Sequence, residues 1–146
     1  MFHCRISSNI NDLNTLNKQF NWIPNEYTIR PNNQSLQLKK IFCSQILEKY
    51  KSFNDYIYQE VFRSNTNNKW IFMPSYFTYN VHHKTNHFVL WNSELNMNFD
   101  YNDIFINNKI KEELNKITPF YDFVWYKNPN PTVMDYYHIQ VFWIKL

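Results

Sequence analysis

Residues 119–146 read PFYDFVWYKNPNPTVMDYYHIQVFWIKL, with a run of aromatic and β-branched residues towards each end. Runs of this kind are typical of β-strands. We therefore expect one strand at residues 120–127 and a second at residues 136–144. The loop between them is short and rich in Asn and Pro, so the two strands should lie side by side and run antiparallel.

The strand at 136–144 presents two different faces, because side chains alternate across a strand. One face is apolar and suits a protein core: Tyr137, Ile139, Val141 and Trp143. The other face is mixed: Tyr136, His138, Gln140 and Phe142. A buried strand without chemistry more often carries Val or Thr where His138 and Gln140 stand. These two are candidate catalytic residues, and the alternative for His138 is a buried histidine with a structural role.

Two helices are predicted in the first half of the chain. Residues 35–51 place apolar side chains along one side of a helix. A further helix follows, with Phe53, Ile57 and Val61 as its buried row. Ser52 is the expected N-cap of this helix. Residues 1–34 are an N-terminal extension with weak patterning, in which a short helix is expected at 8–20.

The second half of the chain predicts the order strand, strand, helix, strand, strand. Apolar runs at 70–73 and 87–91 are the first two strands. A helix then begins at Asp100 or Asn102 and continues to about residue 116. Its apolar row is Ile106, Ile110, Leu114 and Ile117. The elements predict one α+β domain over residues 1–146, with helices covering one face of an antiparallel sheet.

The composition excludes several classes of protein. The chain contains no Gly, which removes the Gly-rich phosphate loops of Rossmann and P-loop proteins. Its net charge of +3 is modest and its basic residues are scattered, so nucleic acid is not an expected partner. No apolar run reaches the roughly 18 residues of a membrane span, and no membrane partner is expected. Two cysteines outside any CxxC pair indicate a reduced, cytoplasmic protein. The sequence leaves the oligomeric state open.

Three histidines lie within six residues, at His82, His83 and His87. This spacing suits no familiar tetrahedral metal site, and neither cysteine lies nearby in the sequence. We therefore expect no metal and no other cofactor. His87 is expected at the edge of a ligand pocket instead.

Four runs, in this order, resemble the family of N-acetylglucosamine-induced protein 1: YKSFNDYIYQEVF at 50–62, HFVLWN at 87–92, FVWYKNP at 123–129 and TVMDYYHIQVF at 132–142. The resemblance covers the chain from residue 50 to the C-terminus. In that family a Trp-x-Lys-Asn loop precedes a His-x-His-Val strand. Here Trp125, Lys127 and Asn128 match the loop, and Gln140 stands in place of the second His. The resemblance implies kinship without naming a reaction.

The same C-terminal segment is similar, more distantly, to the histidine-triad superfamily, which includes the galactose-1-phosphate uridylyltransferase branch. The last strand of that fold carries His-x-His-x-His, or His-x-His-x-Gln in the uridylyltransferases. Tyr136, His138 and Gln140 occupy these positions, so Tyr136 replaces the first His. The resemblance implies a histidine-triad-like fold in which His138 attacks an α-phosphate. It also implies that Thr132, six residues before His138, contacts that phosphate.

These observations predict a nucleotidyltransferase or hydrolase that acts on a nucleotide or nucleotide sugar through His138. A nucleophilic imidazole presents one nitrogen to phosphorus while the other donates to a fixed acceptor, such as a carbonyl of the preceding loop. Gln140 is suited to donate its amide to a phosphate oxygen. The expected ligand-binding residues are Thr132, Lys127, Asn128, His87 and Tyr136. The alternative is a non-catalytic module that binds a nucleotide or sugar phosphate without turnover.

Overall fold

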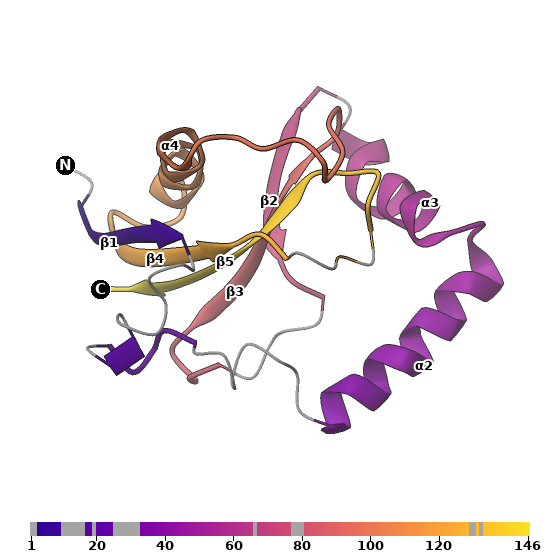
Figure 1. The fold of residues 1–146 in the computed structure, drawn as a ribbon, viewed down its shortest axis with the longest axis horizontal. Helices are drawn as coiled ribbons and strands as arrows, with labels where there is room; N and C mark the ends of the chain where they lie inside the picture. Colours follow the sequence, from indigo (N-terminus) through magenta and orange to yellow (C-terminus); the bar gives the residue numbers. More distant parts are fainter. Residues whose placement is uncertain are drawn as a thin grey trace.

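A computed structural model describes residues 3–9, 17–18, 20–24, 33–65, 67–76, 81–128, 131 and 133–146, and its centre is a five-stranded sheet (Figure 1). The strands are β1 (His3–Asn9), β2 (Trp70–Pro74), β3 (Asn86–Asn92), β4 (Phe120–Tyr126) and β5 (His138–Lys145). Their order across the sheet is β1-β4-β5-β3-β2. The last four pair antiparallel with their neighbours, and β1 runs parallel to β4. The predicted α+β class is confirmed.

β4 and β5 form the antiparallel pair that the sequence predicts, with Tyr126 opposite Gln140. On its other side β5 pairs with β3, where Trp91 lies opposite His138. The candidate residues His138 and Gln140 therefore project from a strand that is hydrogen-bonded along both edges. Such a strand holds its side chains on a rigid backbone.

α4 (Asp103–Asn115) covers one face of the sheet. Asn102 is its N-cap, since the Asn102 side-chain oxygen accepts from the Phe105 amide at 2.8 Å. The core beneath it contains Leu90, Ile106, Ile110, Leu114, Tyr121, Phe123, Trp125, Tyr137, Ile139, Val141 and Trp143. The four residues predicted for the core, Tyr137 just before β5 and Ile139, Val141 and Trp143 within it, are among them. The predicted burial of Ile117 is wrong: the helix has ended by then, its period no longer applies, and Ile117 is 51% exposed.

The opposite face of the sheet is also covered, in two parts. α3 (Phe53–Ile57) continues into a π-helical turn, η2 (Tyr58–Phe62), and a 3-10 turn, η3 (Arg63–Asn65). The cluster under these turns contains Ile57, Val61, Phe62, Val89, Trp91 and Val133. Residues 22–23 pack against Val124 and Phe142 farther along the same face. The expectation that helices cover one face is therefore wrong, because the apolar rows of α3 and α4 bury against opposite faces.

α2 (Asn33–Lys49) precedes α3 and lies beside the same face of the sheet as α3 (Figure 1). A reciprocal cap separates the two helices. The Asp55 amide donates to the Ser52 hydroxyl at 3.1 Å, and the Lys51 amide donates to the Asp55 carboxylate at 3.2 Å. Ile46 is the one buried residue among the described side chains of α2, whereas Leu38 and Ile41 are each 57% exposed. No helix within the described ranges is long and apolar enough to cross a membrane.

β1 is the element that the sequence analysis missed. A short helix was expected at residues 8–20, but Ser8 and Asn9 belong to β1, where they lie opposite Val124 and Trp125. Asn17 and Lys18 are helical, and the remainder of the expected helix lies outside the described residues, apart from Phe20. The residues of β1 have weak strand propensity, so its pairing with β4 more than a hundred positions later decides its conformation.

Candidate functional site

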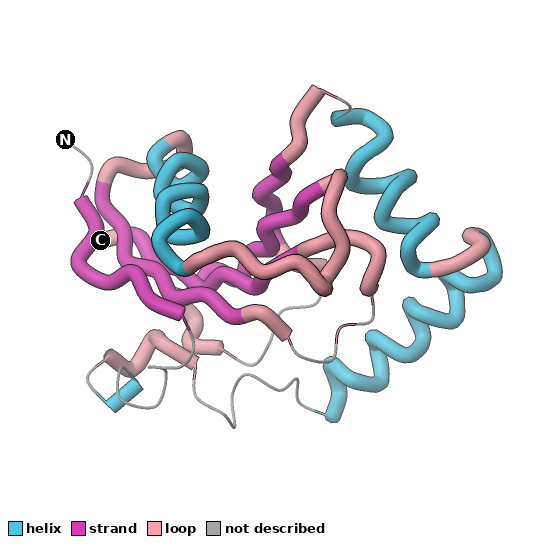
Figure 2. Tube along the Cα trace, turned by 45° about the horizontal axis from the view of Figure 1, so that its top comes forward, coloured by secondary structure: helices cyan, strands magenta, loops and turns pink. Residues whose placement is uncertain are grey.

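A cavity of about 160 Å³ lies between α2, α3 and the face of the sheet that carries His138 and Gln140. Figure 2 shows α2 and α3 together on one side of the sheet, away from α4. The helical wall consists of Lys39, Phe42, Cys43, Ile46, Phe53, Tyr56 and Ile57. The sheet and its loops contribute Pro74, Ser75, Tyr76, Val89, Trp91, Asn128, Pro131, Val133, His138 and Gln140. Among these lining residues none is acidic, and Lys39 is the basic one.

His138 is held in one orientation and one tautomer. Its Nδ1 lies 2.9 Å from the carbonyl oxygen of Tyr136. A carbonyl can only accept, so Nδ1 carries the proton and Nε2 keeps its lone pair. The ring stacks on Trp91, with 4.4 Å between the ring centroids, and His138 is 6% exposed. Nε2 has no hydrogen-bond partner within the described part of the chain.

Burial lowers the pKa of His138, and the positive charge of Lys127 lowers it further, against the opposing effect of the Tyr136 carbonyl. The imidazole is therefore neutral at physiological pH. A neutral ring with a fixed Nδ1–H is the state in which Nε2 can act as a nucleophile or as a hydrogen-bond acceptor. The carbonyl partner is the one that the sequence analysis expected in the loop before β5.

Gln140 is bonded to His87 from the neighbouring strand. Gln140 Oε1 and His87 Nε2 are 2.6 Å apart. Because an amide oxygen only accepts, His87 Nε2 carries the proton. His87 is 4% exposed, and its ring stacks on Phe142 with 4.7 Å between centroids. Burial lowers the pKa of His87 to about 4, although the bond to Gln140 works in the opposite direction.

The backbone before β5 is tied to the loop that follows β3. The Asn92 amide donates to the Tyr137 carbonyl at 2.9 Å, and the Tyr137 amide donates to the Leu95 carbonyl at 2.6 Å. The Met97 amide donates to the Met134 carbonyl at 3.0 Å. These bonds flank Tyr136 on both sides, so they hold in place the carbonyl that orients His138. This loop was not predicted as part of the site.

Asn92 shapes that loop with its side chain. It is fully buried, and its Oδ1 accepts from the amides of Glu94 at 2.8 Å and Leu95 at 3.1 Å. This is an Asx turn, the local geometry that favours Asn at the end of a strand. The Asn in HFVLWN was therefore the signal in the sequence that a sharp turn follows β3.

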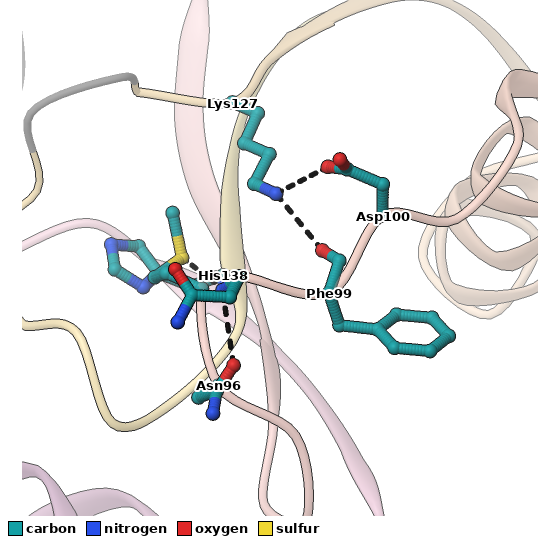
Figure 3. A network of polar contacts seen from close by, with 7 residues as sticks. Asn96, Phe99, Asp100, Lys127 and His138 are labelled. Atoms are coloured by element: carbon teal, nitrogen blue, oxygen red, sulfur yellow. Dashed lines mark hydrogen bonds and ion pairs between the residues drawn. The ribbon is translucent and has the colours of Figure 1, made fainter.

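Lys127 lies away from the cavity. Its ammonium is 2.5 Å from the Asp100 carboxylate and 2.9 Å from the Phe99 carbonyl, as Figure 3 shows. It also lies 5.3 Å from the centre of the Tyr137 ring, on the face of the sheet that α4 covers. Asn128, the next residue, does line the cavity. Successive residues leave the end of β4 on opposite sides, so the structure separates two residues that the sequence analysis had placed in one site.

The remaining expected ligand-binding residues are distributed as follows. Tyr136 contributes its carbonyl to His138, while its ring packs against Phe62 with 4.7 Å between centroids. His87 lies behind Gln140 and is not among the lining residues. Thr132 lies outside the described residues, and its neighbours Pro131 and Val133 line the cavity.

The aromatic wall formed by Phe42, Phe53, Tyr56 and Tyr76 was not anticipated as part of a site. Of these residues, Phe53 was predicted to lie in the buried row of its helix. Phe42 and Tyr56 meet edge to face at 5.9 Å, and Tyr56 lies 6.0 Å from Tyr76. Burial is the main cause that raises the pKa of Tyr56, so its phenol stays protonated. The wall therefore offers uncharged aromatic rings together with the hydroxyl groups of Tyr56 and Tyr76.

His82 and His83 lie against each other, with 4.2 Å between their ring centroids. Within the described ranges, no three His, Cys, Asp or Glu side chains come together as metal ligands.

No protein-family model and no curated protein matches this chain. Among solved structures, the crystal structure of HTC1 is similar with a TM-score of 0.49 and 14% sequence identity. The similarity covers 94% of this chain and 81% of that chain. A likeness at this level says nothing about the site.

Proposed function

We propose that this protein is a histidine-triad-like nucleotidyltransferase or hydrolase that acts on a nucleotide or nucleotide sugar through His138. The observation that carries the proposal is the 2.9 Å contact between His138 Nδ1 and the Tyr136 carbonyl. It leaves the Nε2 lone pair of a neutral imidazole on a residue that lines a cavity. The resemblance of Tyr136, His138 and Gln140 to the triad strand supports the same reading.

The proposed reaction has two steps. Nε2 of His138 attacks the α-phosphorus, an N–P bond forms, and the P–O bond to the leaving group breaks with its electron pair on the leaving oxygen. Water, which releases a proton to the solvent, or an anionic oxygen of a phosphorylated acceptor then attacks the same phosphorus. The N–P bond breaks with its electron pair on Nε2, which restores the neutral ring. The amide NH₂ of Gln140 donates to a non-bridging oxygen during both steps.

The cavity wall suits the remainder of such a ligand. Phe42, Tyr56 and Tyr76 offer aromatic surface against which a base or a sugar ring packs. Lys39 supplies positive charge for the phosphate. The described lining residues include no acidic group, so no carboxylate there would repel an anionic ligand.

A non-catalytic binding module is the second candidate, and the position of Lys127 favours it. Its ammonium is engaged by Asp100 and the Phe99 carbonyl on the other face of the sheet. Lys39 is then the basic group left among the described lining residues to offset phosphate charge in the transition state. Such a cavity would retain a nucleotide without accelerating its cleavage.

Two measurements on the wild type test the proposal and separate the candidates. A thermal-shift panel of nucleotides and sugar phosphates reports binding, and release of labelled nucleotide reports turnover. The enzyme reading predicts both a stabilising ligand and release above background, lost in His138→Ala and kept in the exposed control His83→Ala. Stabilisation without release in any condition would leave the binding module, and a panel without any stabilising ligand would overturn both.

A further inference from the structure

His87 and Gln140 form a polar pair inside a largely apolar wall. Gln140 lines the cavity and His87 lies behind it, with His87 Nε2 at 2.6 Å from Gln140 Oε1. His87 stands opposite Phe142 in the register of β3 and β5, so its bond to Gln140 is diagonal across the two strands. The ring is fixed in this position by its stacking on Phe142.

The bond decides which end of the Gln140 carboxamide faces the cavity. A free carboxamide can turn over and present either its oxygen or its NH₂ group, which have opposite hydrogen-bonding character. In the structure the atom next to His87 Nε2 is the carboxamide oxygen, which places the proton on Nε2 and leaves the NH₂ group towards the ligand. The NH₂ group has no partner within the described part of the chain.

His87 keeps one protonation state across the physiological pH range. Burial holds its pKa at about 4, so the ring is neutral and carries a single proton, which the 2.6 Å contact with Gln140 Oε1 places on Nε2. If the carboxamide turned over, its oxygen would face a phosphate oxygen, and two acceptors would repel each other. The orientation therefore bears directly on which chemical group the cavity accepts.

We propose that His87 is a positioning residue that holds the Gln140 carboxamide with its NH₂ group in the cavity, so that this position accepts an oxyanion. The ligand role of this group rests on the proposed function, whereas its orientation can be measured without any ligand.

The test uses uniformly ¹⁵N-labelled full-length protein, without ligand and with inorganic phosphate as the probe. Without ligand, we expect His87 to be protonated on Nε2 and the side-chain amide of Gln140 to give a dispersed pair of signals. In His87→Phe, which keeps a ring against Phe142 but removes the donor, those signals should move towards the values of a free glutamine. His83→Phe is the matched control and should leave them unchanged. A proton on Nδ1 of His87, or unchanged Gln140 signals in His87→Phe, overturns the positioning role whatever the protein binds.

Phosphate titration of the same samples tests the oxyanion role. We expect phosphate to shift the Gln140 amide signals, with about tenfold weaker binding in His87→Phe and in Gln140→Leu, as for loss of one charge-assisted hydrogen bond. The double variant should bind no more weakly than either single variant, because the two residues act as one unit. Additive losses overturn the coupling. If phosphate does not bind although the ligand-free signals behave as expected, the proposed function fails while the positioning of Gln140 by His87 stands.

Discussion

The backbone carbonyl of Tyr136 fixes the imidazole ring of His138, two residues later in the chain. His138 Nδ1 lies 2.9 Å from that carbonyl oxygen, just before β5 enters the sheet. The tautomer thus follows from local backbone geometry, without a carboxylate partner. The backbone is in turn held by the loop after β3, through Asn92 and Leu95. Stability and site geometry are therefore linked at this corner of the molecule, which the following predictions use.

The two faces of β5 should respond differently to truncation. Ile139→Ala removes a fully buried side chain from the core under α4, so we expect a loss of about 2–5 kcal/mol in the free energy of unfolding. His138→Ala should cost less, because the ring borders a cavity, but should abolish ligand binding or turnover. Urea unfolding with a ligand assay measures both, with Ile104→Ala at a 72% exposed position as the control. An unfolded His138→Ala beside an unaffected Ile139→Ala would mean that the faces are reversed.

Acid should destabilise the protein through its buried neutral histidines. The pKa of His87 is about 4 in the folded state and has its ordinary value of 6.5 in the unfolded chain, so the unfolded chain binds more protons between these pH values. Stability is then fully present above about pH 6.5 and falls as the pH drops towards 4, by about 3 kcal/mol for this residue. His138, whose pKa is also lowered, acts in the same direction. Urea unfolding as a function of pH should show a shallower fall in His87→Phe, and an identical fall would refute the contribution of His87.

Asn92→Ala should loosen the segment that carries the Tyr136 carbonyl. The change removes the acceptor for the Glu94 and Leu95 amides, so we expect a loss of about 1–3 kcal/mol in unfolding free energy. Hydrogen exchange of the Tyr137 amide should accelerate by more than this global loss explains. The exposed Asn98→Ala provides the comparison. Equal exchange in the two variants, once corrected for stability, would show that Asn92 does not hold this segment.

The two lysines should separate ligand binding from structure. Lys39 lines the cavity, so Lys39→Met should weaken binding of an anionic ligand by about tenfold. Lys127 pairs with Asp100 on the other face, so Lys127→Met should leave affinity nearly unchanged and cost at most about 1 kcal/mol of stability. Isothermal titration of both variants with the best ligand of the thermal-shift panel is the measurement. A larger loss of affinity in Lys127→Met than in Lys39→Met would mean that Lys127 binds the ligand.

Gln140 bears on how a covalent intermediate would be resolved. A His at this position can shuttle a proton, whereas a Gln can only donate and accept hydrogen bonds. We expect weak hydrolysis with better transfer to a sugar phosphate acceptor in the wild type, and a higher ratio of hydrolysis to transfer in Gln140→His. Nucleotide release with and without acceptor gives this ratio. An unchanged ratio in an active variant would remove Gln140 from the resolving step.

The sequence predicted those features that depend on local patterns. Alternation along β5 correctly separated Ile139 from His138. Helix caps depend on short local motifs, so Ser52 was predicted as a cap, and Asn102 was one of the two residues, with Asp100, predicted for the start of α4. The same alternation applied to β4 would have placed Lys127 with Trp125, on the face under α4. That separation was therefore readable but was overlooked.

The features that the sequence did not predict depend on contacts between distant parts of the chain. β1 becomes a strand by pairing with β4, and the cavity exists because Phe42 and Tyr56 lie across from Trp91 and His138. The bond between His87 and Gln140 joins residues 53 positions apart. Periodicity reports which side of an element is apolar, but it does not report which two elements meet.

The attack of His138 Nε2 on phosphorus can be tested by trapping its covalent product. Full-length protein is incubated with α-phosphate-labelled nucleoside triphosphates and nucleotide sugars, denatured, and digested for mass spectrometry under alkaline conditions that preserve phosphohistidine. We predict an acid-labile nucleotidyl group on Nε2 of His138, absent from His138→Ala and present in His83→Ala. Label on another residue, label on Nδ1, or equal labelling of His138→Ala would contradict the proposed role of this histidine.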